Sequence, residues 1–333
     1  MKKLFLTLVI IVFITSALKA DEKDKFLEKI YLQKLKSLGE IHNTQNTQCD
    51  LCGCYFGIEP NYSNNSVGIR YSYFKFVNEP HVADVNPNLD HEVDPTQTET
   101  EIYSKVEIYA RYNVNPHFRL SLTVPYKLND INGKTVRDFG DVLLMGQYLV
   151  YASEMSLKNE SRYRQRVYLG AGIKAPTGAF NKQLTYGITE PHFQPGTGAF
   201  DFLLTGTYFA KYKDFGFNAD ASYSIATTNK NEYRFADRFN TSASLFYQLA
   251  IDQTGLMPHA GVYFENAGRD KQNNVEVDDS GGDVLFLTGG ADIYFSDFSL
   301  NLTYQYPLKD KLNGDQAGNK FRVIAGLNYY FGM

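Results

Sequence analysis

A strict alternation of apolar and polar residues runs through EIYSKVEIYARYNVNPHFRLSLTVPYKL, which spans residues 101–128. Its two runs are separated only by a short turn around Asn115 and Pro116. A period of two places successive side chains on opposite faces, so each run predicts a β-strand with one apolar and one polar face. The alternation restricts this part of the chain to β-structure and leaves open which face points inward.

The N-terminus has the features of a cleavable secretory signal. Lys2 and Lys3 give a basic start, residues 4–14 form an apolar run, and Ala20 is a small residue suited to cleavage. The run is shorter than the ~20 apolar residues that a membrane-spanning helix needs. We therefore expect a signal peptide over residues 1–20, a periplasmic N-terminal segment over 21–62, and the main domain over 63–333.

The charge balance argues against nucleic acid as a partner. The full chain has 33 basic and 37 acidic residues, and loss of the three lysines in residues 1–20 leaves 30 against 37, a net charge near −7. A mildly acidic protein does not attract phosphate backbones. No long apolar run follows residue 20, which excludes helical membrane spans.

The alternation recurs in about twelve segments of roughly 10–14 residues, the length and period of transmembrane β-strands. The connections between these segments are alternately short turns and longer polar loops. Outer-membrane barrels have this asymmetry, with short periplasmic turns and long external loops. An even strand number places both ends in the periplasm. The expected strands are 66–77, 100–114, 117–128, 140–151, 163–175, 199–211, 215–227, 239–251, 255–265, 283–295, 298–309 and 320–332.

The make-up of the two faces indicates which one meets lipid. A soluble β-sandwich would bury its apolar face and show the same alternation. Here the apolar faces are uniformly large, aromatic residues gather near strand ends, and the polar faces carry Gly, Ser, Thr and charges of both signs. We therefore predict an all-β, antiparallel transmembrane barrel of about 12 strands, surrounded by lipid in the outer membrane of a Gram-negative-type bacterium. Pro125, Pro258 and Pro307 remove ladder donors, and we expect them to mark strand ends.

The polar parity of the strands is expected to face the barrel interior. Two interpretations are open: the charges pair into a network that plugs a narrow barrel, or charges and tyrosines line a narrow solute path. About twelve strands lie between packed eight-stranded barrels and open porins of 16–18 strands, so geometry allows both, and we favour the path. The side chains expected to line it are Arg70, Lys105, Glu107, Tyr109, Arg111, Arg119, Arg164, Arg166, Tyr168, Lys174, Asp201, Asp220, Glu265 and Arg322.

Three stretches in the middle of the chain carry a family pattern: FGDVLLMGQYLV (139–150), GAGIKAPTGAFN (170–181) and GTGAFDFLL (196–204). In this order they resemble the outer-membrane transporter family named for the meta-cleavage pathway of phenol degradation, although Phe139 and Ala175 depart from its pattern. The resemblance implies a β-barrel that passes small, often hydrophobic or aromatic compounds. The residues that it carries over, with structural roles in tight turns and at strand ends, are Gly140, Asp141, Pro176, Thr177, Gly178, Gly196, Gly198 and Asp201.

Three cysteines precede the first expected strand. Cys49, Cys52 and Cys54 form a CxxCxC cluster, and one reading is a local disulfide with a spare thiol. The other readings are capture of a soft metal, Cu(I) or Zn(II), by the thiolates, and intermolecular pairing or anchoring through them; no cofactor other than this metal is expected. Apolar residues at helical spacing upstream predict a short helix or an irregular segment, so residues 21–54 could dock a periplasmic partner.

No catalytic signature accompanies these features. GxSxG, HExxH, P-loop and dinucleotide-binding motifs are lacking, and His117 and His259 lack the serine pattern of outer-membrane phospholipases. We therefore expect a non-enzymatic protein: a narrow passive channel or transporter for small solutes, hydrophobic or aromatic ones if the family resemblance holds. The alternative is a closed structural or binding barrel whose cysteine cluster binds a soft metal or a periplasmic partner.

Overall fold

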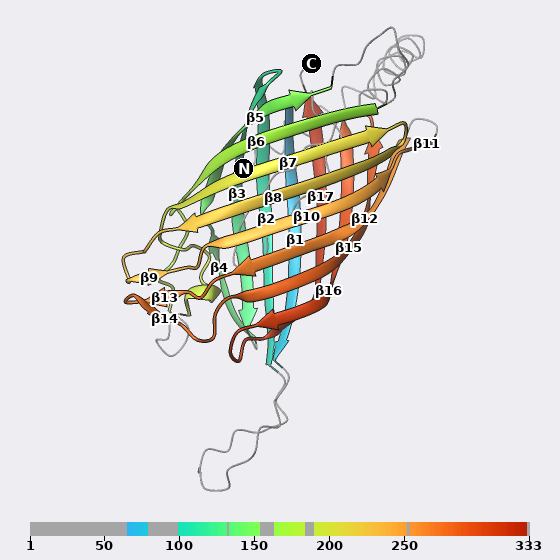
Figure 1. Cartoon of the computed structure of the whole chain (residues 1–333). Coiled ribbons are helices and arrows are strands. Elements are labelled where there is room, and N and C mark those ends of the chain that lie inside the picture. The colour runs from blue at the N-terminus through green and yellow to red at the C-terminus, as the bar shows by residue number, and fades with distance from the viewer. Residues whose placement is uncertain are drawn as a thin grey trace, which may run out of the picture. The chain divides into compact units, whose positions relative to one another are not determined.

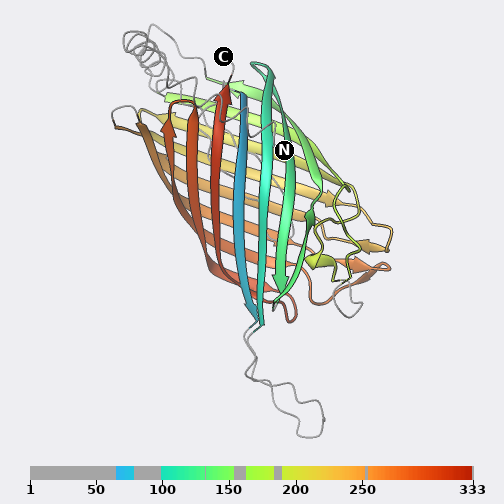
Figure 2. The same cartoon turned by 180° about the vertical axis from the view of Figure 1, so that it is seen from behind.

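The computed structural model describes residues 65–78, 99–131, 133–153, 163–183, 190–251 and 254–331. In these residues twelve long antiparallel strands close into one barrel (Figures 1 and 2). The neighbour order is β1-β2-β3-β5-β6-β7-β8-β10-β12-β15-β16-β17, and β17 pairs with β1 to complete the ring. The predicted all-β barrel of about twelve strands is confirmed.

The barrel strands agree with the predicted segments to within a few residues. The predicted loop over residues 129–139 is wrong, because β3 continues into it and the short strand β4 pairs back onto β3. No helix among the described residues is long and apolar enough to cross a membrane. The barrel strands are β1 (Asn65–Asn78), β2 (Glu99–Asn115), β3 (Phe118–Ile131), β5 (Val142–Ala152), β6 (Tyr163–Ala175), β7 (Asp201–Tyr212), β8 (Phe215–Ala226), β10 (Arg238–Tyr247), β12 (Thr254–Ala267), β15 (Gly282–Phe295), β16 (Phe298–Leu312) and β17 (Gly318–Phe331).

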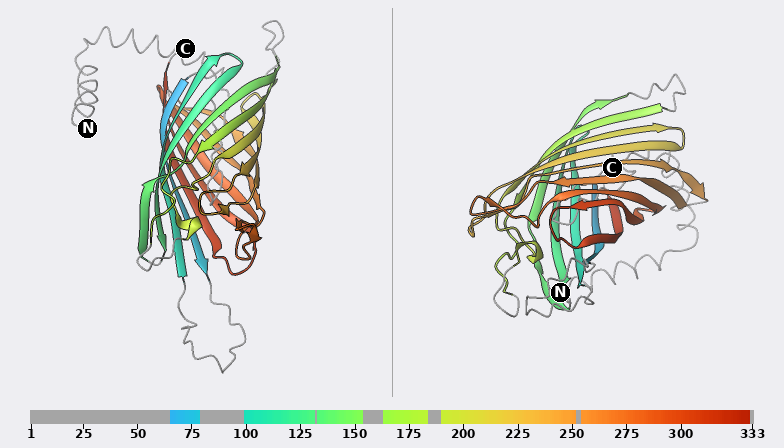
Figure 3. Two further views of the ribbon diagram at one scale, coloured as in Figure 1. Left: turned by 90° about the vertical axis from the view of Figure 1, so that its left-hand side faces the viewer. Right: turned by 60° about the horizontal axis from the view of Figure 1, so that its bottom comes forward.

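Shorter elements complete the wall and the long-loop end. The strands β4 (Lys134–Phe139) and β5 both pair with β3, and β10 and β11 (Leu249–Ile251) both pair with β12, so each couple acts as one interrupted barrel strand. Beyond the barrel, three short strands form a separate sheet near the single 3-10 turn of the described residues (Figure 3). These loop elements are η1 (Pro191–Phe193), β9 (Tyr233–Arg234), β13 (Lys271–Gln272) and β14 (Val275–Glu276).

Burial along the strands shows which face points inward. In β3 the odd-numbered residues from Arg119 to Asn129 are buried, whereas Leu120 and Leu122 are 37% and 43% exposed. A closed barrel has only an inside and an outside, so the buried polar parity lies inside and the large apolar parity faces outward.

Exposed aromatic side chains gather at the short-turn end of the barrel. They lie within a few residues of the strand termini that meet at the tight turns, as an interfacial girdle requires. Such rings place the boundary of the hydrocarbon layer at this level. The girdle consists of Tyr112, Tyr148, Tyr151, Tyr163, Tyr212, Phe215, Tyr247, Phe298, Tyr329 and Phe331.

The three strand prolines lie within strands, so the prediction that they mark strand ends was wrong. Pro125 lies where β3 changes its neighbour from β5 to β4, and its carbonyl accepts the Gly140 N–H at 2.9 Å. Pro258 in β12 lies opposite the break between β10 and β11, and Pro307 lies at a bulge between β15 and β16. Each ladder is already interrupted at that point, so the missing N–H costs little.

Candidate functional site

A buried charge network lies in the barrel interior between β1 and β2. Glu107 is fully buried, with Arg70 Nε 2.7 Å from its Oε2 and Lys105 Nζ 2.9 Å from its Oε1. The strand register sets Arg70 directly opposite Glu107, so the ion pair is a cross-strand pair on the inner face. Two cations therefore share the Glu107 carboxylate.

Neighbouring arginines donate hydrogen bonds to polar side chains and contact aromatic rings. Arg111 donates to Ser66 Oγ at 2.8 Å, and Arg119 Nε donates to Gln147 Oε1 at 2.9 Å. The Arg119 guanidinium also lies 4.2 Å from the centroid of the Tyr168 ring. A ring face stabilises a desolvated cation, so the interior tyrosine supports the arginine.

On β6, β7 and β8 the interior carries further pairs. Lys174 forms an ion pair with Asp201, and Thr207 donates to Asp220 at 2.8 Å. All fourteen residues predicted to face inward lie on the inner parity of their strands. Arg164, Arg166 and Glu265 are half-buried there, and the other eleven are buried.

Large apolar side chains share this interior, and the sequence analysis missed them. Phe74 and Phe76 follow Arg70 at spacings of two, so continuing the inner parity to the end of the strand would have found them. Their presence makes the interior a mixture of aromatic, aliphatic and charged groups. The three buried clusters are Phe74, Phe76 and Ile324; Tyr168, Phe209, Phe246 and Met257; and Leu143, Leu203, Tyr263, Val284 and Phe286.

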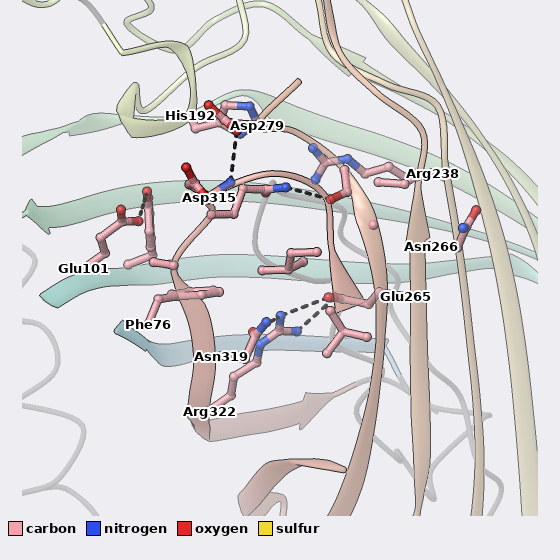
Figure 4. A pocket seen from close by; sticks show the side chains of 18 of the residues that line it. Phe76, Glu101, His192, Arg238, Glu265, Asn266, Asp279, Asp315, Asn319 and Arg322 are labelled. Carbon is pink, nitrogen blue, oxygen red and sulfur yellow. Dashed lines mark hydrogen bonds and ion pairs between the residues drawn. The ribbon is translucent and has the colours of Figure 1, made fainter. Parts of the chain in front are cut away.

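A cavity of about 370 Å³ lies at the long-loop end of the barrel (Figure 4). Phe76, Tyr103, Val284 and Leu312 form its apolar wall. Its charged lining among the described residues is acidic on balance, because five carboxylates face two arginines and one histidine. These are Glu101, Glu190, Glu265, Asp279 and Asp315, with Arg238, Arg322 and His192.

One ion pair of the cavity lining joins strands that are not neighbours. Arg322 on β17 donates to both carboxylate oxygens of Glu265 on β12, each at 2.9 Å. Its guanidinium lies 4.9 Å from the Phe74 centroid and 4.1 Å from the Phe286 centroid. Two strands separate β12 from β17, so the pair spans part of the interior beside the cavity.

The loop that contains η1 packs into the long-loop end beside this cavity. Phe193 is fully buried, makes an edge contact with the Tyr103 ring at 6.2 Å, and accepts a hydrogen bond from Asn129 Nδ2 at 3.0 Å. The side chain of Gln194 binds both the N–H and the carbonyl of Lys182, at 2.9 and 2.8 Å. These contacts fix the loop over one side of the interior.

A buried carboxylate ties three loop segments together at the same end. Asp270 accepts Tyr233 Oη at 2.6 Å and the Ala236 N–H at 2.7 Å, and it lies 2.6 Å from His192 Nε2. Burial by itself raises the pKa of Asp270, but the contact with His192 and the charge of Arg238 outweigh it and lower the pKa to about 2. Burial of Tyr233 is the larger cause that raises the pKa of its hydroxyl, and the nearby negative charge of Asp270 raises it further.

The three sequence motifs meet at one point of the barrel wall. Asp141 accepts the Gly178 N–H at 2.9 Å, and its other oxygen accepts the N–H and the hydroxyl of Thr197, both at 2.8 Å. Gly140 and Asp141 form the break between β4 and β5, so the carboxylate satisfies backbone donors where the ladder is interrupted. We call Gly140, Asp141, Gly178, Gly196 and Thr197 the motif cluster.

The glycines of the motif cluster are required by close backbone approach. A Cβ on Gly178 would lie 2.7 Å from the Gly140 carbonyl carbon and 2.8 Å from Gly196 Cα. Among the glycines that the family pattern carries over, Gly198 alone has a positive φ, of 70°, a conformation that glycine adopts without strain. Pro176 follows the last residue of β6, as predicted.

The N-terminal predictions fall outside the described residues. These are the signal peptide (1–20), the segment 21–62 with its helix, and Cys49, Cys52 and Cys54. Within the described residues no group of three or more His, Cys, Asp or Glu side chains is arranged to hold a metal ion.

Closed antiparallel strands, an apolar outer face and a polar interior define an outer-membrane β-barrel. The chain belongs to the family described as "Putative MetA-pathway of phenol degradation", whose model matches residues 75–323. The predicted family resemblance is therefore confirmed. No curated protein sequence matches the chain.

One solved structure shares the fold at low sequence identity, and two others are similar at lower TM-scores. The COG4313 outer membrane channel from Pseudomonas putida F1 is 14% identical, with a TM-score of 0.55 over 80% of this chain and 96% of that chain. The β domain of the Bordetella autotransporter BrkA is 12% identical, with a TM-score of 0.42 over 81% and 100%. A TodX mutant titled a monoaromatic hydrocarbon channel is 9% identical, with a TM-score of 0.42 over 81% and 91%.

Proposed function

We propose that this barrel is a narrow passive channel for small, partly apolar solutes. The observation that carries the proposal is the mixed interior, in which the Arg322 guanidinium lies against two aromatic rings in the lining of a cavity of about 370 Å³. A cavity with apolar walls and a few polar groups suits a small ring compound. The family description names phenol degradation, which supports aromatic solutes, and the structure with a TM-score of 0.55 is titled an outer membrane channel, which supports a channel.

Transport in this proposal is diffusion down a concentration gradient. The apolar part of the solute contacts Phe76, Tyr103, Val284 and Leu312 in the cavity, which lowers the cost of leaving water. Its polar groups then exchange hydrogen bonds with interior arginine and tyrosine side chains, so width and electrostatic field select the solute. No bond of the solute breaks, and we therefore propose a non-enzymatic protein.

We assign the first selective contact to the pair of Arg322 and Glu265. It belongs to the cavity lining, and its guanidinium lies between two aromatic rings, Phe74 and Phe286. A planar aromatic solute can stack on the Arg322 guanidinium in place of one of these two rings. The guanidinium then keeps an aromatic ring on each side and is not left against an apolar wall.

Uptake into liposomes tests the proposal. The refolded full chain is inserted into vesicles, and entry of phenol, benzyl alcohol and a sugar of similar mass is followed by osmotic swelling. We expect the protein to accelerate entry of both aromatic solutes more than entry of the sugar. Equal rates with and without the folded barrel would contradict a channel.

The alternative function is a closed structural or binding barrel. The observation in its favour is the dense interior, where Arg70, Glu107, Arg111 and Arg119 are each at most 4% exposed. Such a barrel inserts into vesicles without raising permeability to any solute, so the same experiment separates the two functions.

For the N-terminal segment we propose two of the states that the sequence leaves open. Cys49, Cys52 and Cys54 either form one disulfide with a spare thiol or bind a soft metal, and residues 21–54 contact a periplasmic partner. Counting free thiols in the purified full chain before and after addition of Zn(II) distinguishes the two cysteine states. One free thiol that zinc does not protect identifies the disulfide, whereas three that zinc protects identify the metal site.

A further inference from the structure

Three adjacent strands change from apolar to basic on their outer face as they approach the long-loop end. These strands, β16, β17 and β1, form the wall nearest the viewer in Figure 2. In β1 the outward Tyr73 is followed by Lys75, and in β16 the exposed Leu308 is followed by Lys309. We call the set on these strands the lysine rim: Lys75, Lys309, Lys311 and Lys320.

The register brings the members of the lysine rim to one level of the barrel. Lys75 pairs with Phe321, and the adjacent Lys320 occupies the bulge in the ladder between β1 and β17. On the next strand, Asp310 accepts the Asn319 N–H, which ties the segment around Lys309 and Lys311 to the start of β17. Four lysines far apart in the sequence therefore share one sector.

Stacked aromatic rings lie on the same outer face, nearer the middle of the barrel. Tyr73 and Phe321 are stacked with centroids 5.9 Å apart, and Phe321 and Tyr304 are stacked with centroids 6.0 Å apart. Rings of this kind occupy the boundary between hydrocarbon and headgroups. Lysines just beyond them extend toward the headgroup layer while their methylene stems stay on apolar surface.

The strands of the sector are basic on balance, whereas the β16–β17 turn beyond them carries Asp315 with Asp279 beside it. Asp283 and Asp310 lie among the four lysines, and both carboxylates are engaged by asparagine side chains, Asn266 and Asn319 respectively. The opposite wall differs: the outer faces of the described strands β7, β8 and β10 carry no lysine or arginine. Near the long-loop end they present Phe202, Tyr223 and Phe239 instead.

We propose that the lysine rim binds the phosphate groups of a lipid in the outer leaflet, whose acyl chains lie against the stacked rings. The chemistry that fits is a phosphorylated glycolipid of the lipid A type, since ammonium groups bind phosphate as point charges and the rings offer a flat apolar surface. The site lies on the outer face of the wall and is independent of any transport through the interior.

The test compares bis-phosphorylated lipid A with the same lipid after removal of both phosphates. Binding of each to the purified full chain is measured by native mass spectrometry for the wild type and for Lys309→Gln/Lys311→Gln. Each lysine near an anionic surface is expected to contribute about fivefold in affinity, so the variant is expected to lose roughly 25-fold for the phosphorylated lipid. Affinity for the dephosphorylated lipid is expected to stay unchanged.

The matched control is Lys213→Gln/Lys230→Gln, which removes two exposed lysines outside the rim. It is expected to bind both lipids as the wild type does. The proposal is overturned if the wild type does not prefer the phosphorylated lipid, or if the control loses as much affinity as the rim variant.

Discussion

The motif cluster and the cavity lining both bury carboxylates at the long-loop half of the barrel, and they use them differently. In the motif cluster Asp141 accepts only from backbone N–H groups and one hydroxyl, where three backbone segments touch. In the cavity lining Glu265 meets a guanidinium between aromatic rings. The first arrangement fixes the path of the chain, whereas the second leaves an amphipathic surface for a solute. The residues that identify the family are therefore structural, and the solute contacts that we propose lie elsewhere.

The largest expected effect is the loss of the Asp141 carboxylate. Asp141→Ala leaves the N–H groups of Gly178 and Thr197 buried without their acceptors, at about 1–3 kcal/mol each. We expect the free energy of unfolding to fall by roughly 2–5 kcal/mol in urea titrations of the barrel in lipid vesicles. An unchanged unfolding midpoint would show that the motif cluster does not hold the wall together.

The second prediction concerns the ion pair of Arg322 and Glu265 in the cavity lining. Arg322→Ala/Glu265→Ala removes both partners, so no buried charge is left unpaired, and it shortens two side chains of the cavity lining. We expect single-channel conductance to rise severalfold, with a smaller loss of stability than for Asp141→Ala. A variant that conducts as the wild type does would exclude this pair from the solute path.

The third prediction is a loss of loop stability in acid. The pKa of Asp270 is lowered to about 2 from an unfolded value near 3.9, so its stabilisation is complete above pH 4 and disappears as the pH falls towards 2. The shift corresponds to roughly 2 kcal/mol. Pepsin cleavage within residues 228–281 should accelerate over this pH window in the wild type. Asp270→Asn should be cleaved rapidly throughout, and Asp278→Asn, whose carboxylate is largely exposed, should follow the wild type.

The smallest expected effect lies at the surface beside the motif cluster. Asp138 and Lys182 form an ion pair at 2.6 Å whose side chains are 37% and 39% exposed. Solvent screens such pairs, so Asp138→Ala should change the free energy of unfolding by no more than about 1 kcal/mol. A loss as large as that of Asp141→Ala would mean that the distinction between buried and exposed carboxylates is wrong.

The strands and their inner parity were predictable because a period of two assigns alternate residues to opposite faces. The register was not predictable, since a shift by two residues keeps the parity and changes every partner, so the structure was needed to place Glu107 opposite Arg70. The reason for the glycines was not predictable, since contact between Gly140, Gly178 and Gly196 depends on how three distant segments fold together. The cavity could not be predicted from the sequence for the same reason. Loop residues such as His192 and Asp315 complete its lining, and loops have no periodic pattern that would place them.

The central claim is that the polar faces enclose a path through the membrane. Current recordings across planar bilayers that contain the folded full chain test it most directly. We predict stepwise increases in conductance, smaller than those of a wide porin, that phenol partly blocks from the long-loop side. Folded, correctly inserted barrels that pass no current and no solute would contradict the account.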